Sequence, residues 1–372
     1  MSTVVVAPDS FKGSASATEV ATALAEGWRA ERPGDHVLRA PMADGGEGTL
    51  DAFEVAVPGA IRHPMRVTGP SGDGVDASWL LLPDGTALVE LAETSGLGLL
   101  RRPAPHDAHT IGFGQAIAAA LDAGATGLLL AIGGSASTDG GSGALTALGA
   151  RLLDADGRIV PPGNRGLGRL ARVDLDGLRP LPPGGARILS DVTSPLLGPS
   201  GAAAVFGPQK GATAADVPVL EAGLARFAAV ASGAVGDRAD VADPAAAGAG
   251  AAGGTGFGLM LWGATVSAGA AAVGEAIGLP ALVGSADAVL TGEGRFDSQS
   301  AAGKVPEYVS GLAAAAGIPA YLAAGSIQAP PAAFAASAEL AALSGGVDAA
   351  IADPARWARE AGAALARAHT AR

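Results

Sequence analysis

The sequence predicts an α/β fold in which a doubly wound parallel-sheet domain carries an inserted second α/β domain. Three patterns lead to this prediction. A strand, a loop and a helix follow one another twice before residue 58, which is typical of parallel strands joined by crossover helices. Residues 60–92 instead form short, turn-bounded strands, and helix and buried strand return after residue 110. The change in pattern favours two domains, as does the length of 372 residues.

The N-terminal elements follow from local sequence. The β-branched run Thr3–Ala7 is typical of a buried parallel strand. Residues 16–19, Ser-Ala-Thr-Glu, fit a capping box, in which the serine hydroxyl and the glutamate carboxylate each accept a hydrogen bond from a free backbone N–H at the start of a helix. A second strand at His36–Ala40 and a helix with one apolar face at Leu50–Val57 complete the repeat.

The rest of the chain supplies further strands and one clear helix. Between residues 60 and 92 a meander is expected, with strands at Arg66–Thr68, Ser78–Leu82 and Ala87–Leu91. The later elements are expected to be a helix at Ile111–Leu121 and strands at Gly127–Ile132, Ala186–Ser190, Ala288–Thr291, Ala320–Ala323 and Ala349–Ala352. We therefore assign residues 1–58, 97–134 and 286–372 to the doubly wound domain, and residues 59–96 and 135–285 to the inserted domain. The active site is expected in a cleft between them.

Composition excludes several classes of function. There is no cysteine, so disulfides, thiolate metal sites and thiol nucleophiles are excluded. A net charge of −12 and the lack of any basic patch argue against nucleic acid as a partner. No membrane span is expected, and the first residues lack the basic and apolar regions of a signal peptide, so a cytoplasmic location is the expectation. The chain is compatible with a monomer or a homodimer.

Four strands end in loops that combine glycine with Asp, Glu, Ser or Lys. The loops lie at residues 9–13, 44–49, 133–141 and 291–298. In an open parallel sheet, ligands bind past the carboxyl ends of the strands. Glycine-rich turns at a helix N-terminus present N–H donors to anions, and carboxylates beside them suit Mg²⁺. Together these are the parts that phosphoryl transfer requires.

The lysines support the same interpretation. The 24 basic side chains include only three lysines, Lys12, Lys210 and Lys304, and each lies next to a glycine. A compact ammonium on a flexible stem can follow a moving phosphoryl group, whereas a guanidinium is planar and rigid. The alternative is that three lysines stand in flexible turns by chance, since the chain has 57 glycines.

Other ligand motifs are absent or weak. A P-loop would need a glycine at position 298, where serine stands. Gly248–Gly253 matches a dinucleotide fingerprint in letters, but no strand precedes it, so a loop is expected there. His106 and His109 have the spacing of metal ligands without a third partner. Two alternatives to a kinase stay open: a nicotinamide-dependent hydroxy-acid reductase, and a non-catalytic protein that binds a nucleotide or an organic acid.

Several blocks of sequence together resemble the bacterial type I glycerate kinases. The resemblance runs in order from residue 4 to about 327. It is carried by Ala-Pro-Asp-Ser-Phe-Lys-Gly-Ser at 7–14, Pro-Met-Ala-Asp-Gly-Gly-Glu-Gly-Thr at 41–49, Glu-Leu-Ala-Glu-Thr-Ser-Gly-Leu at 90–97, the loop at 133–141, the block at 195–212 that ends in Gln-Lys-Gly-Ala, and Thr-Gly-Glu-Gly-Arg-Phe-Asp-Ser-Gln at 291–299 with Gly303-Lys304-Val305-Pro306. The chain departs from the family pattern in two blocks. Thr138 stands where Asn is usual, and residues 190–195 read Ser-Asp-Val-Thr-Ser-Pro where the family usually has Cys-Asp-Val-Asp/Thr-Asn-Pro, so that Asp191 is kept.

The resemblance implies a Rossmann- or flavodoxin-like domain, a two-domain cleft, and transfer of the ATP γ-phosphoryl group to D-glycerate with Mg²⁺. The product it favours is 2-phosphoglycerate rather than 3-phosphoglycerate. Asp191, at the end of a predicted strand, is the first candidate for the base, with a turn or helix cap as the alternative. Asp297 is the rival base or a Mg²⁺ ligand, and Lys12 is expected to contact phosphate or the substrate carboxylate.

The remaining candidates are assigned by the chemistry of their side chains. Arg295 is expected to bind the substrate carboxylate through two hydrogen bonds or to pair with a neighbouring carboxylate. Asp9, Asp44 and Glu47 are expected to hold Mg²⁺ or substrate hydroxyls, or to cap helices. Substrate contacts are thus expected from Asp9, Ser10, Asp44, Glu47 and Arg295, metal contacts from Asp44 and Asp297, and phosphate or nucleotide contacts from Gly133, Gly134, Ser135, Ser137, Thr138, Lys210, Glu293 and Lys304.

Overall fold

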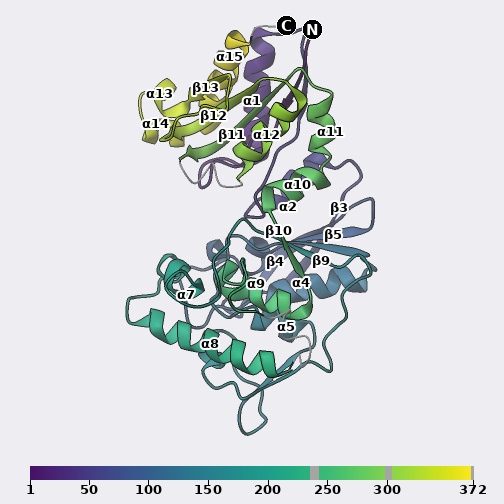
Figure 1. Cartoon of the computed structure of the whole chain (residues 1–372), viewed down its shortest axis with the longest axis vertical. Helices are drawn as coiled ribbons and strands as arrows, with labels where there is room; N and C mark the ends of the chain where they lie inside the picture. Colours follow the sequence, from purple (N-terminus) through teal and green to yellow (C-terminus); the bar gives the residue numbers. More distant parts are fainter. Residues whose placement is uncertain (235–242, 298–303, 370–372) are drawn as a thin grey trace. The chain divides into compact units, whose positions relative to one another are not determined.

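The computed structural model describes residues 1–234, 243–297 and 304–369, and it divides into two compact units (Figure 1). Unit 1 comprises Met1–Asp44, Asp51–Pro58 and Ala268–Arg372, and unit 2 comprises Gly45–Leu50 and Gly59–Ser267. Helix α2 (Thr49–Ala56) spans one of the crossings between them. Ser298, Gln299 and Gly303 of the motifs discussed above lie outside the described residues.

Unit 1 is built on a parallel sheet of five strands in the order β13-β12-β11-β1-β2. Its strands are β1 (Thr3–Val6), β2 (His36–Arg39), β11 (Ala288–Phe296), β12 (Ala320–Ile327) and β13 (Ala336–Glu339). Its helices are α1 (Ala17–Glu31), α10 (Gly269–Ala276), α11 (Leu279–Gly284), α12 (Val305–Ala316), α13 (Leu340–Ser344), α14 (Val347–Ala352) and α15 (Pro354–Ala368).

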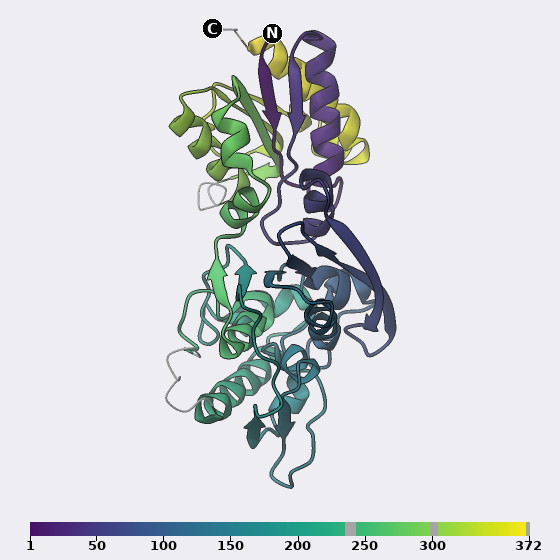
Figure 2. The same cartoon turned by 90° about the vertical axis from the view of Figure 1, so that its right-hand side faces the viewer.

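Helices cover both faces of this sheet, as the doubly wound prediction requires. Figure 2 shows the purple helix α1 and the yellow helix α15 on one face of the sheet and the green helix α12 on the other. The core under α1 and α15 contains Val4, Leu24, Trp28 and Leu365. Because β1 is apolar at Val4, Val5 and Val6, it can be buried on both faces, which is the condition for a central parallel strand.

Unit 2 contains a sheet of six strands in the order β10-β9-β6-β5-β4-β3. Its strands are β3 (Ile61–Thr68), β4 (Gly74–Leu81), β5 (Thr86–Glu90), β6 (Gly127–Ala131), β9 (Ala186–Leu189) and β10 (Thr265–Ser267), and a separate hairpin is formed by β7 (Arg151–Leu153) and β8 (Arg172–Asp174). The first three strands pair antiparallel, which confirms the predicted meander, and β5, β6, β9 and β10 pair in parallel.

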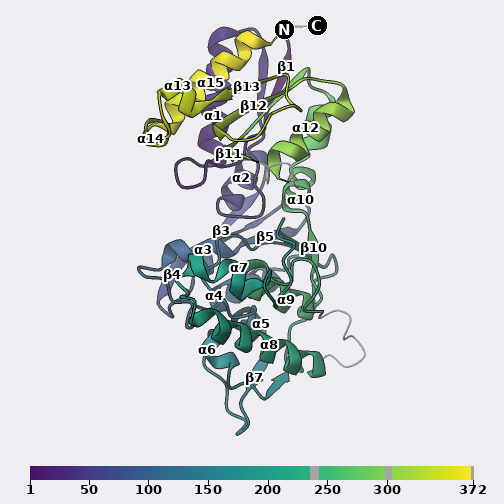
Figure 3. The same ribbon diagram turned by 60° about the vertical axis from the view of Figure 1, so that its left-hand side comes forward.

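The helices of unit 2 are mostly short. They are α3 (Leu91–Ser95), α4 (Ile111–Asp122), α5 (Ser142–Ala147), α6 (Asn164–Leu167), α7 (Ala202–Phe206), α8 (Asp216–Ala234) and α9 (Ala251–Trp262), with single 3-10 turns at Leu97–Leu99 and Pro208–Lys210. Helices α4, α5, α8 and α9 lie on one side of the sheet (Figure 3). Among the described residues, α8 alone is long and apolar enough to cross a membrane, but Leu220, Leu224 and Phe227 on it are buried in the core of unit 2.

The structure differs from the expected domain bounds and strands in several places. Residues 45–50, expected in the doubly wound domain, lie in unit 2. Residues 97–134 lie in unit 2, because β6 pairs with β5 and β9 of that sheet. The boundary expected at 285 falls at 267, since α10 and α11 belong to unit 1. The strand expected at Ala349–Ala352 is part of helix α14, which fits the high helix propensity of alanine.

Candidate active site

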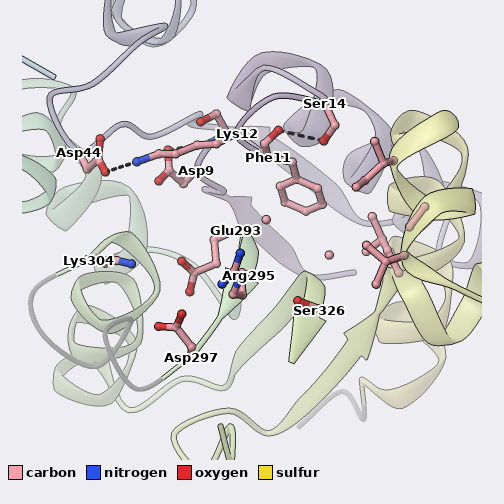
Figure 4. A pocket seen from close by; sticks show the side chains of 17 residues that line it. Asp9, Phe11, Lys12, Ser14, Asp44, Glu293, Arg295, Asp297, Lys304 and Ser326 are labelled. Carbon is pink, nitrogen blue, oxygen red and sulfur yellow. Dashed lines mark hydrogen bonds and ion pairs between the residues drawn. The ribbon is translucent and has the colours of Figure 1, made fainter. Parts of the chain in front are cut away.

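A cavity of unit 1 lies where its sheet changes direction. From β1 the chain continues to β2 on one side, and from β11 it continues to β12 on the other, so the switch point lies between β1 and β11. A cavity of about 440 Å³ opens at the residues that follow β1 and that end β11. Crevices at such switch points bind ligands in α/β proteins. Eight of the predicted site residues line this cavity, namely Asp9, Ser10, Lys12, Asp44, Glu293, Arg295, Asp297 and Lys304 (Figure 4).

The order of elements explains why these residues meet. Asp9 and Lys12 follow β1, and Asp44 follows β2, which pairs with β1 in parallel. Glu293 and Arg295 lie on β11 itself, because this strand runs to Phe296 and pairs with β12 over its whole length. The loop expected at 291–298 is therefore strand as far as residue 296. Parallel pairing brings the carboxyl ends of three strands to one edge, and the acidic and basic side chains gather there.

The best-defined contact in the cavity is an ion pair. The Lys12 Nζ atom donates to Asp44 Oδ2 at 2.9 Å, and the Lys12 side chain remains 70% exposed while that of Asp44 is 19% exposed. Burial lowers the pKa of the Lys12 ammonium, but Asp44, and then Asp9 and Glu293, outweigh burial and hold the pKa above its usual value. Lys12 is therefore a charged group at neutral pH with an exposed stem that can reach a ligand.

The environment of Asp9 strongly perturbs its carboxyl group. Its side chain is buried, and Oδ1 accepts a hydrogen bond from the Ser10 backbone N–H at 2.7 Å. Burial, together with the neighbouring carboxylates of Asp44 and Glu293, raises the pKa of Asp9 to about 7, against the opposing effects of Lys12 and the Ser10 N–H. A carboxyl group with a pKa near neutrality can take up and release a proton under physiological conditions, which is what a general base needs.

The carboxylates of the cavity suit a magnesium ion that arrives with phosphate. Asp9, Asp44, Glu293 and Asp297 offer hard oxygen donors. Among the described residues, no group of three or more Asp, Glu or His side chains is arranged to hold a metal ion by itself. Mg²⁺ commonly binds through one or two carboxylates together with substrate phosphates and waters. The donor set therefore fits Mg²⁺ carried by a nucleotide better than a resident metal.

The loop at 133–141, in unit 2, is not arranged as the expected phosphate cradle. Several of its backbone N–H groups donate within the protein: Gly133 to Gly45, Ala136 to Ser95, Ser137 to the Ser135 hydroxyl, Gly140 to Gly253, and Gly141 to the Asp139 carboxylate. Ser137 and Thr138 are completely buried, and Ser135 is nearly so, while Gly134 is exposed. Since these amides already have acceptors, the loop cannot offer them to a phosphate as it stands.

Lys210 lies beneath this loop. Its side chain is 2% exposed, and Nζ donates to the Ser137 carbonyl oxygen and, at 3.4 Å, to the Ser135 hydroxyl. Burial lowers the pKa of Lys210 to about 7, and the carboxylate of Asp139 only partly offsets this. The Lys210 side chain therefore supports the loop from inside the protein, where it donates to protein oxygens and not to the surface.

A left-handed turn next to Gly253 also contacts the loop at 133–141 and Lys210. It lies at the end of the segment Gly248–Gly253, where a loop was expected. Residues Ala252, Gly253 and Gly254 have positive φ angles of 54°, 67° and 86° at the start of α9. A Cβ atom on Gly253 would lie 2.0 Å from the Ser137 carbonyl oxygen and 2.8 Å from the Lys210 ammonium. Only glycine leaves room for both groups at this point.

Asp191 and Glu47 lie in unit 2 and do not line the cavity of unit 1. Asp191 is partly buried two residues after the end of β9, as predicted. Glu47 is exposed on the short segment Gly45–Leu50.

Sequence reasoning missed two features, a buried carboxylate in unit 2 and the apolar wall of the cavity in unit 1. Glu90 is buried at the end of β5, and its two carboxylate oxygens accept from the backbone N–H groups of Gly48 and Leu50, both at 2.9 Å. Glu90 is the first residue of the block Glu-Leu-Ala-Glu-Thr-Ser-Gly-Leu at 90–97, and its place in that block is the sequence signal that could have identified it. The apolar wall of the cavity, formed by Leu340 on α13 and residues of α14, was missed because α14 was expected to be a strand.

Comparison with known proteins identifies relatives along nearly the whole chain. Residues 4–370 match the model of the glycerate kinase family. The chain is 42% identical to the glycerate 2-kinase of Escherichia coli over 315 residues, 83% of this chain and 81% of that protein. It is also 42% identical to the glycerate kinase of Bacillus subtilis over 87% of this chain and 85% of that one. A crystal structure from Salmonella typhimurium, assigned as glycerate kinase 2, superposes with a TM-score of 0.84 at 38% identity, covering 98% of this chain and 97% of the other.

Proposed function

Because the chain belongs to the glycerate kinase family, we propose that it transfers the γ-phosphoryl group of ATP to D-glycerate and that 2-phosphoglycerate is the product. The observation that carries this proposal is the cavity between β1 and β11, where four carboxylates meet three cations, Lys12, Arg295 and Lys304. Phosphoryl transfer needs little covalent chemistry from the protein, and depends on positioning, on cations that balance phosphate charge and on a group that takes the acceptor proton.

The proposed reaction is a direct displacement of ADP from the γ-phosphorus. The 2-hydroxyl oxygen of glycerate forms a bond to the γ-phosphorus, the bond from that phosphorus to the β–γ bridging oxygen breaks, and ADP leaves with the electron pair. The hydroxyl proton passes to a carboxylate, and we assign this role first to Asp9, since its pKa of about 7 matches the task. Asp297 in the same cavity and Asp191 in unit 2 are the alternative bases.

The positively charged side chains of the cavity are assigned to the glycerate carboxylate and to phosphate according to their exposure and shape. Arg295 is exposed on β11 and presents a planar guanidinium that can bind the glycerate carboxylate with two hydrogen bonds. We assign the phosphate contacts to Lys12, whose side chain is exposed, and to Lys304, at the start of α12. Mg²⁺ bound to the nucleotide would neutralise charge on the β- and γ-phosphates, with Asp44 or Asp297 as its protein contact.

Lys210 and the loop at 133–141 are given a supporting role in unit 2. The buried ammonium fixes the turn from Ser135 to Ser137, and the exposed Gly134 is the part of that loop open to a ligand. The partners of the protein are small molecules, ATP and glycerate. A cytoplasmic location and a monomeric or homodimeric state remain part of the proposal.

The test is a turnover assay on the purified full-length protein. With ATP, Mg²⁺ and D-glycerate we expect ADP release that depends on all three, and none with L-glycerate above the background without acceptor. Chromatography that resolves 2- from 3-phosphoglycerate decides the position of transfer. If no acceptor-dependent ADP forms, the kinase assignment fails. Oxidation of NADH in the presence of a hydroxy-acid precursor would favour the reductase instead, although no histidine lines the cavity among the described residues.

A further inference from the structure

The cavity between β1 and β11 has a second, apolar half. Its charged side chains lie on one side, and on the other the helices of the yellow C-terminal part of unit 1 form the wall (Figure 4). This wall consists of Leu340 on α13 and of Val347, Ala350 and Ile351 on α14. Val347 and Ile351 keep 53% and 55% of their surface exposed. Single exposed aliphatic residues are common, but these two face a cavity.

The cavity also has a stretch without side chains. Gly294 on β11 and Gly325 on the adjacent strand β12 both line it. A Cβ atom on Gly325 would lie 2.3 Å from the Gly294 carbonyl oxygen, so only glycine fits there. At these two positions the cavity is therefore lined by backbone alone. Ser326, the residue after Gly325, also lines the cavity, and its hydroxyl can hydrogen-bond the edge of a ligand.

The size of the cavity shows that the acceptor does not fill it. Glycerate has seven non-hydrogen atoms, which occupy roughly 200 Å³ at about 30 Å³ each, the share of one water molecule in the liquid. The cavity measures about 440 Å³, so glycerate would fill less than half. A small carboxylic acid with two hydroxyls also has no group that gains from contact with Leu340, Val347 and Ile351.

We propose that this apolar half is the binding site for the nucleobase of ATP, an inference that rests on the proposed function. The planar base lies against the aliphatic side chains of Leu340, Val347 and Ile351, with Gly325 and Ser326 at its edge. The ribose and phosphates then extend toward Arg295, Lys304 and Lys12 in the charged half. Ligand pockets commonly combine such an apolar wall with a few polar groups that fix orientation.

The experiment compares two ligands on three full-length proteins. ADP and pyrophosphate share the diphosphate, but only ADP has the adenosine, so the change in the difference between their affinities from wild type to variant measures the contact of the wall with the adenosine. Ile351→Asp places a carboxylate in the apolar wall. Leu343→Asp is the matched control, since Leu343 is 40% exposed on the neighbouring helix and does not line the cavity. Binding is measured by titration calorimetry with Mg²⁺ present.

We expect Ile351→Asp to weaken ADP binding by roughly tenfold or more and to leave pyrophosphate binding unchanged. In turnover assays the KM for ATP rises and the KM for D-glycerate does not. Leu343→Asp behaves like the wild type. If Ile351→Asp does not fold, as judged by its melting curve, Val347→Ala combined with Ile351→Ala tests the same wall with a smaller expected loss.

Three results would overturn the inference. One is unchanged ADP binding in Ile351→Asp, another is an equal loss of ADP and pyrophosphate binding, and the third is a rise in the KM for D-glycerate in place of that for ATP. Each of them can occur while the wild type still phosphorylates glycerate, so failure of the base site is distinguishable from failure of the kinase assignment.

Discussion

At the scale of single residues, Asp9 is the group whose environment points most directly to chemistry. It is buried beside Asp44 and Glu293, and its pKa of about 7 places it between the charged and neutral forms at physiological pH. The sequence predicted Asp9 as a site residue from its place after the first strand. The sequence could not predict its titration, because that depends on Glu293, which comes 284 positions later and is brought close only by the pairing of β1 with β11.

Asp9→Asn should therefore lower kcat by about 10²–10⁴-fold while the affinity for ADP changes little. In the wild type kcat/KM should rise with pH through about 7, because the base acts in its charged form, and this rise should disappear in the variant. Steady-state rates between pH 5.5 and 8.5 check both points. Asp297→Asn and Asp191→Asn provide the comparison: whichever of the three variants removes turnover and the rise with pH identifies the base.

The buried amino group of Lys210 supports the protein structure by donating hydrogen bonds to the turn from Ser135 to Ser137. The sequence suggested a phosphate contact because lysine is rare here and this one lies beside glycine. Lysine is seldom fully buried, so no local pattern predicts that its ammonium lies under the turn from Ser135 to Ser137. Its position depends on the left-handed turn at Gly253, far along the chain.

The lowered pKa of Lys210 predicts a specific dependence of stability on pH. The unfolded chain holds a proton on Lys210 up to about pH 10.4, whereas the folded protein releases it near 7. Between these values the free energy of unfolding should rise with pH, by up to about 1.4 kcal/mol per pH unit. Urea denaturation at pH 7, 8 and 9 should show that Lys210→Met loses this slope and that Lys304→Met keeps it. Identical slopes in all three proteins would contradict the buried ammonium.

At the scale of elements, local sequence patterns correctly predicted the ends of helices and strands where those ends depend on residues nearby in the sequence. Ser16 Oγ accepts from the Glu19 N–H at 3.2 Å and Glu19 accepts from the Ser16 N–H at 2.8 Å, which confirms the predicted capping box. Local signals failed for β11, where Gly292, Gly294 and Arg295 suggested a loop. Pairing with β12 overrides that local preference and continues the strand to Phe296, and Glu293 and Arg295 on this strand line the cavity.

The segment Gly45–Leu50 depends on one buried carboxylate. Glu90 is 2% exposed and accepts from the N–H groups of Gly48 and Leu50. Glu90→Gln replaces one acceptor oxygen by a donor NH₂, so one of these N–H groups is left without a partner. We expect a loss of about 1–3 kcal/mol in the free energy of unfolding, measured by urea denaturation. Glu360→Gln, at an exposed position of α15, should change it by less than about 0.5 kcal/mol.

At the scale of the whole molecule, the sequence predicted two α/β domains and their discontinuity, but not which strand belongs to which sheet. A buried run such as Gly127–Ala131 is equally suited to either sheet, because both are parallel at that point. Only long-range pairing with β5 and β9 decides its place. The charged residues that line the cavity were nevertheless all named as candidates from the sequence, since the carboxyl ends of parallel strands have a distinctive composition.

The division into units predicts which fragments fold. Residues 59–267 contain all six strands of the second sheet, so this fragment should unfold cooperatively by circular dichroism. Residues 1–58 lack β11, which pairs with β1, and should remain unfolded. A fragment 59–267 without a cooperative transition would show that unit 2 is not an independent folding unit.

The central claim is that the cavity of unit 1 carries out phosphoryl transfer to glycerate, and its most direct test is phosphorus NMR of the reaction itself. The wild type and Asp9→Asn are each incubated with ATP, Mg²⁺ and D-glycerate. We predict that the wild type converts the γ-phosphate signal into that of 2-phosphoglycerate with equal formation of ADP, and that Asp9→Asn binds ADP but forms product at least about 10²-fold more slowly. A wild type that forms no phosphate ester, or an Asp9→Asn variant that forms it at the same rate, would contradict the claim.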